Sequence, residues 1–222
     1  MSRLVLKVGG AVAKDAAAHA LELAAEGHEL VIVHGAGPQI SAELERRGLP
    51  VEFVAGRRVT SEPALEIVRD SLASVNGAVC AAIGPRAIGL FGDEIGLKAT
   101  PAEGLGLVGN AVPSRPPAIE SALELGLIPV VAPLAEGPLN VNADEAAAAL
   151  AVGLHADRIL FYTDVPGLFV EGEVVASIAA DEADRLLDDG ELEGGIVPKL
   201  RAAVTAARGG LQAEIGETAV TA

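Results

Sequence analysis

Residues 4–10, Leu4-Val5-Leu6-Lys7-Val8-Gly9-Gly10, form a short apolar run that ends in two glycines. The run predicts a buried strand over residues 4–8. An Ala- and Leu-rich helix is expected over 16–26, a second buried strand over 30–33 and a second helix over 38–47. This β-α-β-α order is typical of a parallel sheet that helices cover on both faces.

The rest of the chain continues the alternation of helices and strands. Helices are expected over 63–77, 119–125, 145–153, 181–188 and 198–208, and strands over 87–91, 128–132 and 158–162. Residues 92–117 are rich in Gly and Pro and predict a hairpin or loop region, while residues 167–175 predict a hairpin around Glu171-Gly172.

The composition fits one large α/β domain or two small lobes. The chain has 222 residues, half of them apolar, and its few aromatic residues mean that Ala, Val, Leu and Ile must form the core. The net charge of −15 argues against nucleic acid or an anionic membrane as a partner. No stretch approaches the roughly 20 apolar residues of a membrane span, and no leader precedes the first strand. A single cysteine, Cys80, in an apolar setting adds to the prediction of a cytoplasmic location.

Two lysines, Lys7 and Lys199, each stand beside a pair of glycines. Lys7 precedes Gly9-Gly10, whereas Lys199 follows Gly194-Gly195 and Pro198, which suits the first turn of a helix. Glycines between a strand and a helix let an anion approach backbone N–H groups. A cation near a helix N-terminus is unfavourable by itself, so Lys199 indicates either a bound anion or a lysine that is simply solvated. The two ammonium groups predict a phosphoryl group that is held from both sides.

Two further segments carry polar groups or glycines at the ends of expected strands. His34-Gly35-Ala36-Gly37 predicts either backbone amides aimed at an anion or simply a tight turn. Asn140, Asn142 and Asp144 share one side if their segment is extended. The asparagines would then face a substrate and Asp144 would organise the two lysines. The alternative is that Asp144 only caps the helix that follows.

Other features point to ligand binding or exclude particular chemistries. The turn Thr163-Asp164-Val165-Pro166-Gly167 follows a strand, at the edge where α/β proteins bind ligands. Arg58 is a candidate carboxylate clamp, because guanidinium groups bind carboxylates bidentately. There is no Gly-x4-Gly-Lys-Ser/Thr loop, and Ile40 occupies the third glycine position of a dinucleotide fingerprint. The histidines are not paired at metal-ligand spacing, so no protein-held metal is predicted. No Gly-x-Ser-x-Gly elbow of a serine hydrolase occurs.

Taken together and in this order, these motifs resemble those of the amino acid kinase family, over about residues 4–203. The resemblance implies a single domain over residues 1–222, a three-layer αβα sandwich around an open, mainly parallel sheet. It implies an N-terminal lobe, about 1–138, for the amino-acid substrate and a C-terminal lobe, about 139–222, for ATP. It also implies transfer of the γ-phosphoryl group of MgATP to the side-chain carboxylate of N-acetyl-L-glutamate, a step of arginine biosynthesis.

The resemblance also assigns roles to matching positions. Lys7 and Lys199 would stabilise the transferred phosphoryl group, and Asp144 would orient both lysines. The substrate would be held by Gly35, Ala36, Arg58 and Asn140, with a backbone contact from Gly37, and ATP by Gly10, Thr163, Asp164 and Gly167. A carboxylate is already ionised and needs no general base to attack phosphorus. Catalysis is then positioning and charge neutralisation, which suits two lysines and a Mg²⁺ ion held mainly by the ATP phosphates.

The chain departs from the family pattern at several places. Ala36 replaces a glycine of the usual turn, and Arg57 replaces an apolar residue before Arg58. The segment after Gly210 is short, which implies a trimmed sheet on the nucleotide side. No helix precedes Leu4, and in the family that arm accompanies hexamers inhibited by arginine. A homodimer without this inhibition is therefore expected.

Two alternative functions stay open. One is a sibling kinase of lysine biosynthesis that acts on an aminoadipate or glutamate attached to an acidic carrier protein. Such an enzyme should present a basic patch, which the net charge of −15 disfavours. The other is a catalytically weakened homologue that serves as a binding or regulatory protein, which Ala36 and the short C-terminal segment favour. A Rossmann-type oxidoreductase lacks its fingerprint here.

Overall fold

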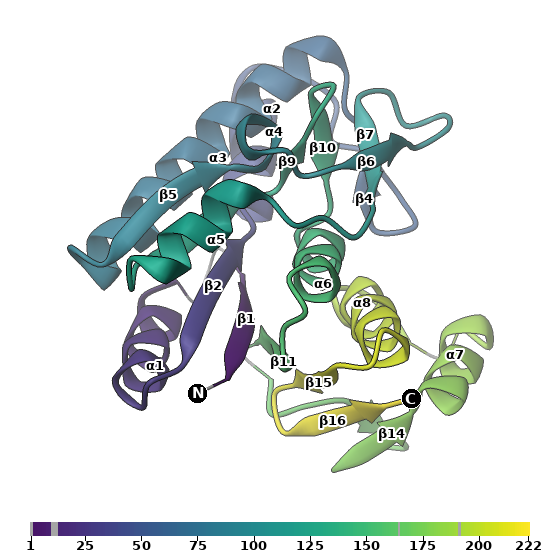
Figure 1. Cartoon of the computed structure of the whole chain (residues 1–222). Coiled ribbons are helices and arrows are strands. Elements are labelled where there is room, and N and C mark those ends of the chain that lie inside the picture. The colour runs from purple at the N-terminus through teal and green to yellow at the C-terminus, as the bar shows by residue number, and fades with distance from the viewer. Residues whose placement is uncertain (1, 10–12, 164, 191) are drawn as a thin grey trace.

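A long, mainly parallel β-sheet runs through the protein and carries helices on both faces (Figure 1). The computed structural model describes residues 2–9, 13–163, 165–190 and 192–222, and within these ranges eight strands form the sheet, in the order β14-β16-β15-β11-β1-β2-β8-β5. Its strands are β1 (Arg3–Val8), β2 (Glu29–His34), β5 (Ala87–Phe91), β8 (Ile128–Ala132), β11 (Arg158–Tyr162), β14 (Ser177–Ala179), β15 (Gln212–Ile215) and β16 (Thr218–Thr221). Neighbouring strands are parallel, except that β15 and β16 are antiparallel.

The helices and the smaller strands are arranged around this sheet. The helices are α1 (Ala13–Ala25), α2 (Gly37–Arg46), α3 (Glu62–Ile83), α4 (Gly92–Ile95), α5 (Pro117–Glu124), α6 (Ala143–Gly153), α7 (Ala180–Asp188) and α8 (Ile196–Arg208). A second sheet has the order β6-β7-β10-β9, with β6 (Ala99–Pro101), β7 (Val108–Ala111), β9 (Leu134–Ala135) and β10 (Leu139–Val141). Two hairpins pair β3 (Phe53–Val54) with β4 (Arg57–Arg58) and β12 (Phe169–Val170) with β13 (Glu173–Val174).

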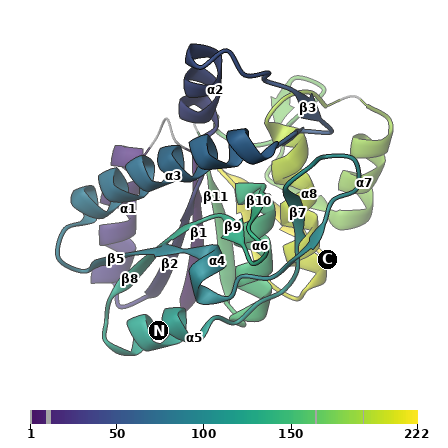
Figure 2. The ribbon, with the colours of Figure 1, turned by 90° about the horizontal axis from the view of Figure 1, so that it is seen from above.

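Side-chain alternation along β1 divides the apolar core into two layers. Leu4, Leu6 and Val8 pack into the cluster that also contains residues of α1, α2 and α3. Val5 packs into the opposite cluster, with residues of α5, α6 and α8. Figure 2 shows α1 and α3 next to each other on their side of the sheet. The expected three-layer αβα sandwich is therefore confirmed, and a residue two positions after Val5 must emerge on the α6 and α8 side.

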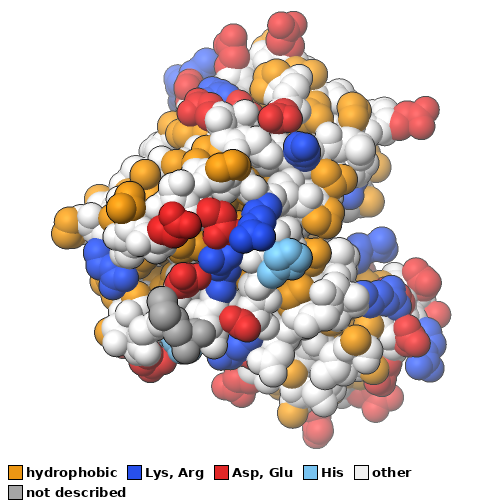
Figure 3. Space-filling view, viewed as in Figure 1, with side chains coloured by type: hydrophobic (Ala, Val, Ile, Leu, Met, Phe, Trp, Pro, Cys, Tyr) orange, Lys and Arg blue, Asp and Glu red, His pale blue; other side chains and the backbone are white. Residues whose placement is uncertain are grey.

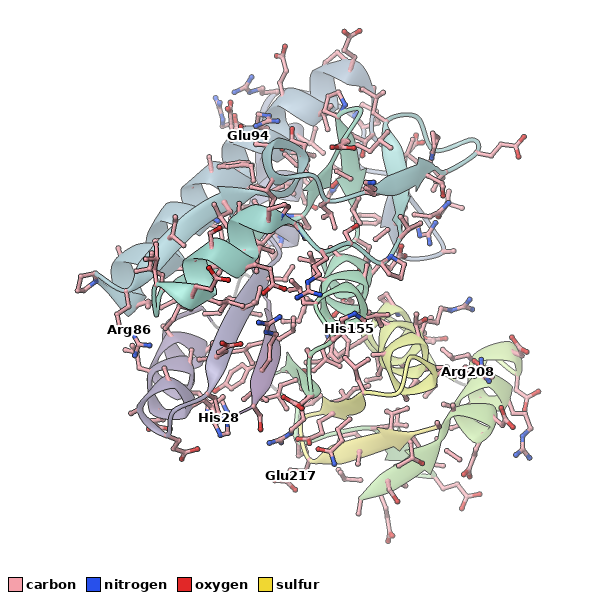
Figure 4. The ribbon with its side chains drawn as sticks, in the orientation of Figure 1. His28, Arg86, Glu94, His155, Arg208 and Glu217 are labelled. Carbon is pink, nitrogen blue, oxygen red and sulfur yellow. The ribbon has the colours of Figure 1, made fainter. Side chains whose placement is uncertain are left out.

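Alanine dominates the surfaces that α6 and α8 bury. Buried positions include Ala147 and Ala151 on α6 and Ala203 and Ala207 on α8. Because a methyl group fills little space, two such helix faces allow close approach of the backbones. At its other end α8 is linked to α7 by Arg208, which lies between the two helices in Figure 4 and contacts Asp181 Oδ1 at 2.9 Å. The packing brings the first turns of α6 and α8 close together.

The expected elements are present, with differences at their ends. The predicted helix over 63–77 continues to Ile83, because nothing breaks it before Gly84, which ends it with a φ of 85°. The predicted hairpin or loop region over 92–117 contains the β6–β7 hairpin together with the short helix α4. The chain after Gly210 forms β15 and β16, which turn at Gly216 and extend the sheet towards β14.

The distribution of charge on the surface and the character of the helices both bear on possible partners. On the face shown in Figure 3, acidic and basic side chains are interspersed over both halves of the molecule. Among the helices of the described ranges, none has both the length and the apolar character that crossing a bilayer requires.

Candidate active site

Two lysines meet at one carboxylate where β1, α6 and α8 converge. Lys7 Nζ lies 2.9 Å from Asp144 Oδ1, and Lys199 Nζ lies 3.2 Å from the same oxygen. Lys7 is 7% exposed and Asp144 is 6% exposed, so this cluster is shielded from bulk solvent. The structure thus brings together the three residues that the sequence assigned to phosphoryl transfer.

Local structure explains why each side chain reaches this point. Lys7 is the next residue after Val5 on the same side of β1, so it points towards α6 and α8. Asp144 is on the first turn of α6, and Lys199 is on the first turn of α8, after Pro198. The close packing of the two Ala-rich helices brings these first turns within ion-pair distance.

Asn142, not Asp144, caps helix α6. Asn142 Oδ1 accepts hydrogen bonds from the backbone N–H groups of Asp144 at 2.8 Å and Glu145 at 3.3 Å. The alternative in which Asp144 only caps the helix is therefore wrong. Asn142 also lines the pocket beside this cluster, but its Oδ1 is used by the end of the helix and is not available to a substrate. Because the cap is supplied two residues earlier, the carboxylate of Asp144 is available to the lysines.

The charges in this cluster do not balance. Burial lowers the pKa of Lys7, the neighbouring Lys199 ammonium lowers it further, and the Asp144 carboxylate acts in the opposite direction. One carboxylate is shared between two ammonium groups, so the cluster keeps an excess positive charge when both lysines are protonated. An anion beside it would supply the missing negative charge, as a phosphoryl group does.

A pocket of about 270 Å³ opens beside this cluster. Lys7 and Asp144 line one part of it, and Gly35, Ala36, Gly37, Arg58 and Asn140 line another. The pocket lies where β1 and β2 end, at the carboxyl edge of the parallel strands, which is the usual ligand-binding edge of such sheets. The predicted substrate-binding residues therefore surround one cavity together with two of the three charged residues.

Arg58 reaches the pocket with part of its guanidinium still unpaired. Its Nη2 donates to Gly37 O at 3.1 Å and to Ser41 Oγ at 2.7 Å, both on α2. Its Nη1 is buried and has no hydrogen-bond partner within the described residues. The guanidinium carbon lies 4.6 Å from the centre of the Phe53 ring, and burial lowers the pKa of Arg58. A buried donor without a partner is costly, so a carboxylate of a bound ligand fits this position.

In the glycine-rich turn after β2, not every backbone amide is available to an anion, contrary to what the sequence suggests. The N–H of Gly35 donates to Val8 O at 3.0 Å, so it is used within the protein. Ala36 is 2% exposed and belongs to the apolar cluster that α1, α2 and α3 share. Its φ of −140° is outside the left-handed region that favours glycine, so alanine is accommodated at this position. Gly37 begins α2 and leaves open space where a Cβ would stand.

Two polar side chains beside the pocket have structural partners. Asn140 Nδ2 donates to Thr60 Oγ1 at 3.0 Å, which holds the Asn140 side chain at the pocket wall. His34 is fully buried on the other face of β2, where its Nε2 lies 3.1 Å from Asn76 Nδ2. Burial lowers the pKa of His34 to about 4, so the imidazole is neutral near pH 7. His34 is thus not a cation for the pocket.

Of the residues predicted to bind ATP, neither Thr163 nor Gly167 lines this pocket. Thr163 lines a separate cavity of about 440 Å³, on the side of the sheet where His19 and Tyr162 lie 5.9 Å apart, ring to ring. Gly167 is buried, and a Cβ there would come within 2.5 Å of Thr218 Oγ1, which indicates a packing role. Gly10 and Asp164, also predicted for ATP, lie outside the described residues.

The sequence does not predict some of the contacts around the site. Glu145 and Arg57 form an ion pair, with Glu145 Oε1 2.8 Å from Arg57 Nε. No local sequence pattern predicts this pair. Asn142 could have been recognised, because an asparagine before an acidic first turn is a common helix start. No cluster of three or more His, Cys, Asp or Glu side chains suited to a metal occurs in the described part of the chain.

Comparison with known sequences gives a consistent result. The sequence profile described as "Amino acid kinase family" matches residues 2–216. An acetylglutamate kinase of Rubrobacter xylanophilus is 42% identical over an alignment of 224 positions, which covers 97% of this chain and 88% of that protein. An acetylglutamate kinase of a Roseiflexus species is 40% identical over an alignment of 225 positions, covering 95% of this chain and 86% of that protein.

Solved structures show the same fold. The crystal structure of smu.665 from Streptococcus mutans has a TM-score of 0.88 and 28% identity, and the match covers 99% of this chain and 98% of that chain. N-acetylglutamate synthase from Neisseria gonorrhoeae, complexed with coenzyme A and N-acetyl-glutamate, has a TM-score of 0.83 and 22% identity, with 100% of this chain and 59% of that chain covered. The second likeness concerns the fold alone.

Proposed function

The chain belongs to the amino acid kinase family, and on that basis we propose that it transfers the γ-phosphoryl group of ATP to the side-chain carboxylate of N-acetyl-L-glutamate. The product is an acyl phosphate, and the reaction belongs to arginine biosynthesis. The proposal is supported by relatives named acetylglutamate kinase, which are 36–42% identical to this chain over nearly its whole length. The protein is thus a kinase whose acceptor is a carboxyl group.

The observation that carries the proposal is the meeting of Lys7 and Lys199 at one oxygen of Asp144. In the reaction, a carboxylate oxygen of the acceptor forms a bond to the γ-phosphorus, and the bond from that phosphorus to the bridging oxygen breaks. ADP leaves with the electron pair. The acceptor is ionised at neutral pH, so no protein group needs to remove a proton. The work left for the protein is to align the reactants and to neutralise charge on the transferred group.

Each residue at the pocket then has a definite task. Lys7 and Lys199 would hold oxygens of the transferred phosphoryl group, and Asp144 would keep the two ammonium groups at the right separation. Arg58 would bind a carboxylate of N-acetyl-L-glutamate through Nη1, the donor that lacks a partner in the protein. Asn140 and the backbone of the turn from Gly35 to Gly37 would complete the acceptor site.

The excess positive charge of the lysine cluster fits the phosphates of ATP, whose charge is the opposite. A magnesium ion would be held mainly by the ATP phosphates and would supply further neutralisation of charge on them. We further propose that the nucleotide binds to the C-terminal lobe, about 139–222, with contacts from Gly10, Thr163, Asp164 and Gly167. We also propose that the protein acts in the cytoplasm as a homodimer.

A substrate panel tests the function. Purified protein is incubated with ATP, Mg²⁺ and N-acetyl-L-glutamate, and the acyl phosphate is trapped with hydroxylamine as its hydroxamate. We expect hydroxamate to form in proportion to the ADP released. Product only with a carrier-linked aminoadipate or glutamate would select the sibling kinase instead. ATP binding without product from any acceptor would select a regulatory protein.

A further inference from the structure

Arg57 ties the β3–β4 hairpin to two other parts of the protein. Its Nε donates to Glu145 Oε1 at 2.8 Å, on the first turn of α6, and its Nη1 donates to Asn110 Oδ1 of β7. The side chains are 28% exposed for Arg57 and 24% for Glu145. Fully exposed ion pairs contribute little to stability. This pair is partly buried and has a third partner, so it fixes a geometry more firmly than a surface pair does.

Arg57 and Arg58 hold the hairpin from opposite sides. They are consecutive residues of β4, so their side chains point in opposite directions. Arg58 contacts Gly37 and Ser41 of α2, whereas Arg57 contacts Glu145 of α6. The position of the substrate clamp is therefore set by α2 on one side and by α6 on the other.

The tip of the hairpin lies against the start of α8. Gly56 adopts a φ of 78°, and a Cβ at this position would lie 3.6 Å from Pro198 Cγ. Pro198 immediately precedes Lys199. The hairpin thus contacts both helices that carry Asp144 and Lys199, and Figure 2 shows β3 near α8.

The pair also matters for Glu145 itself. Burial raises the pKa of Glu145, the nearby Asp144 carboxylate raises it further, and Arg57 opposes both effects. Without Arg57, a partly buried carboxylate beside Asp144 would lose its cation. The hairpin would then lose its attachment to α6 while the attachment of Arg58 to α2 persisted.

We propose that Arg57 is a positioning residue, which through its ion pair with Glu145 sets the place of Arg58 at the acceptor pocket. The role rests on the function proposed above. Because Glu145 follows Asp144 directly on the first turn of α6, the same tie couples the substrate clamp to the turn that orients the two lysines. An apolar residue at position 57 could pack there but could not provide this connection.

A double-mutant cycle tests the proposal with R57Q, E145Q and the combined variant. We expect each single variant to raise KM for N-acetyl-L-glutamate roughly tenfold, with a much smaller change in kcat, because the clamp is then held by α2 alone while the lysine cluster stays in place. The combined variant should be no worse than the poorer single variant, since both remove one interaction. R57K, which keeps a cation, should restore part of the affinity.

Arg69→Gln is the matched control. Arg69 forms a partly buried pair with Asp93, away from the β3–β4 hairpin, so its loss should lower thermal stability without raising KM. An unchanged KM in R57Q, or KM effects that add in the combined variant, would overturn the proposal.

Hydrogen exchange supplies a readout that needs no turnover. Backbone amides of residues 53–60 should exchange faster in R57Q and E145Q than in the wild-type protein, whereas Arg69→Gln should leave them unchanged. Unaltered exchange in this segment would contradict the role of the Arg57–Glu145 ion pair in holding the hairpin. If the wild-type protein forms no product from N-acetyl-L-glutamate, the proposed function fails, and the exchange data still decide whether Arg57 holds the hairpin.

Discussion

Lys7 Nζ lies 2.9 Å from Asp144 Oδ1, and this contact joins the first strand of the sheet to the helix that follows β10. Lys199 approaches the same oxygen from α8, so two cations share one acceptor. Such an arrangement is poorly balanced in the protein alone, since the ammonium groups of the buried Lys7 and the partly buried Lys199 repel each other. It becomes favourable when a phosphoryl group lies between them, as in the transition state of phosphoryl transfer.

Replacing Lys199 should impair turnover far more than folding. In Lys199→Ala, the Lys7–Asp144 ion pair persists and the repulsion between the lysines disappears, so the free energy of unfolding should change by less than about 1 kcal/mol. Turnover should fall by about 10²- to 10³-fold, the usual effect of removing one electrostatic donor. Lys98→Ala serves as the control, because Lys98 lies outside the pocket and outside the lysine cluster. Equal losses of stability and activity in Lys199→Ala would point to a structural lysine.

Unlike Lys199→Ala, Asp144→Asn should clearly lower the stability of the folded protein. The side chain keeps its shape and Asn142 still caps α6, but the two ammonium groups lose the carboxylate between them. Breaking a buried ion pair costs about 3–5 kcal/mol, so urea unfolding should show a clear loss of stability. Added phosphate or ATP should restore more stability in this variant than in the wild-type protein. Asp181→Asn, at a side chain that is 88% exposed, should show neither effect.

The sequence predicts the layers of this fold because their causes are local. Apolar runs that end in glycine mark the strands, and alternation along β1 is enough to direct Lys7 towards α6 and α8. The sequence predicts a helix that ends at residue 77, but a glycine inside a helix is tolerated, and α3 continues until Gly84, whose positive φ stops it.

The details of the site depend on contacts that sequence alone does not reveal. Asn142 and Asp144 are both good helix-capping residues, and only the contact with the lysines decides which side chain is left for the site. Arg57 finds Glu145 at a separation of 88 positions, beyond any periodic pattern. Thr163 and Gly167 follow the expected strand, but neither lies at the acceptor pocket. Thr163 lines another cavity, and Gly167 packs against Thr218.

The pH dependence of turnover should report the burial of Lys7. Burial and the neighbouring Lys199 lower the pKa of Lys7 from its ordinary value of 10.5, so the active, protonated form is lost as the pH rises through that lowered pKa. The alkaline limb of kcat/KM, which reports groups of the free enzyme, should therefore begin below pH 10.5. In Lys7→Arg the limb should move to higher pH, because guanidinium stays charged, even if the maximal rate is lower. An unchanged limb would show that another group controls it.

The same shift has a consequence for stability. Between the pKa of Lys7 in the folded protein and 10.5, the unfolded chain binds more protons at this residue than the folded one does. The contribution of Lys7 to the free energy of unfolding must then rise with pH across this window. Urea unfolding of the wild-type protein and Lys7→Met at several pH values should show the difference moving in favour of the wild-type protein as the pH increases.

Gly37→Ala tests whether a bound ligand lies against the backbone at Gly37. A Cβ at Gly37 would meet nothing within 4 Å, and its φ is not positive, so the protein alone accommodates a methyl group. Alanine is the better helix former, so stability should rise by up to about 1 kcal/mol. Gly37 also lines the pocket, so a ligand that lies against its backbone would collide with the methyl group.

We therefore expect Gly37→Ala to raise the thermal midpoint and yet to raise KM for N-acetyl-L-glutamate or to lower kcat. Gly77→Ala is the matched control, because Gly77 is an exposed residue inside α3 and a Cβ there also meets nothing within 4 Å. This control should gain stability and keep full activity. If both variants gain stability and neither loses activity, the acceptor does not contact the backbone at Gly37, and the turn after β2 only connects a strand to a helix.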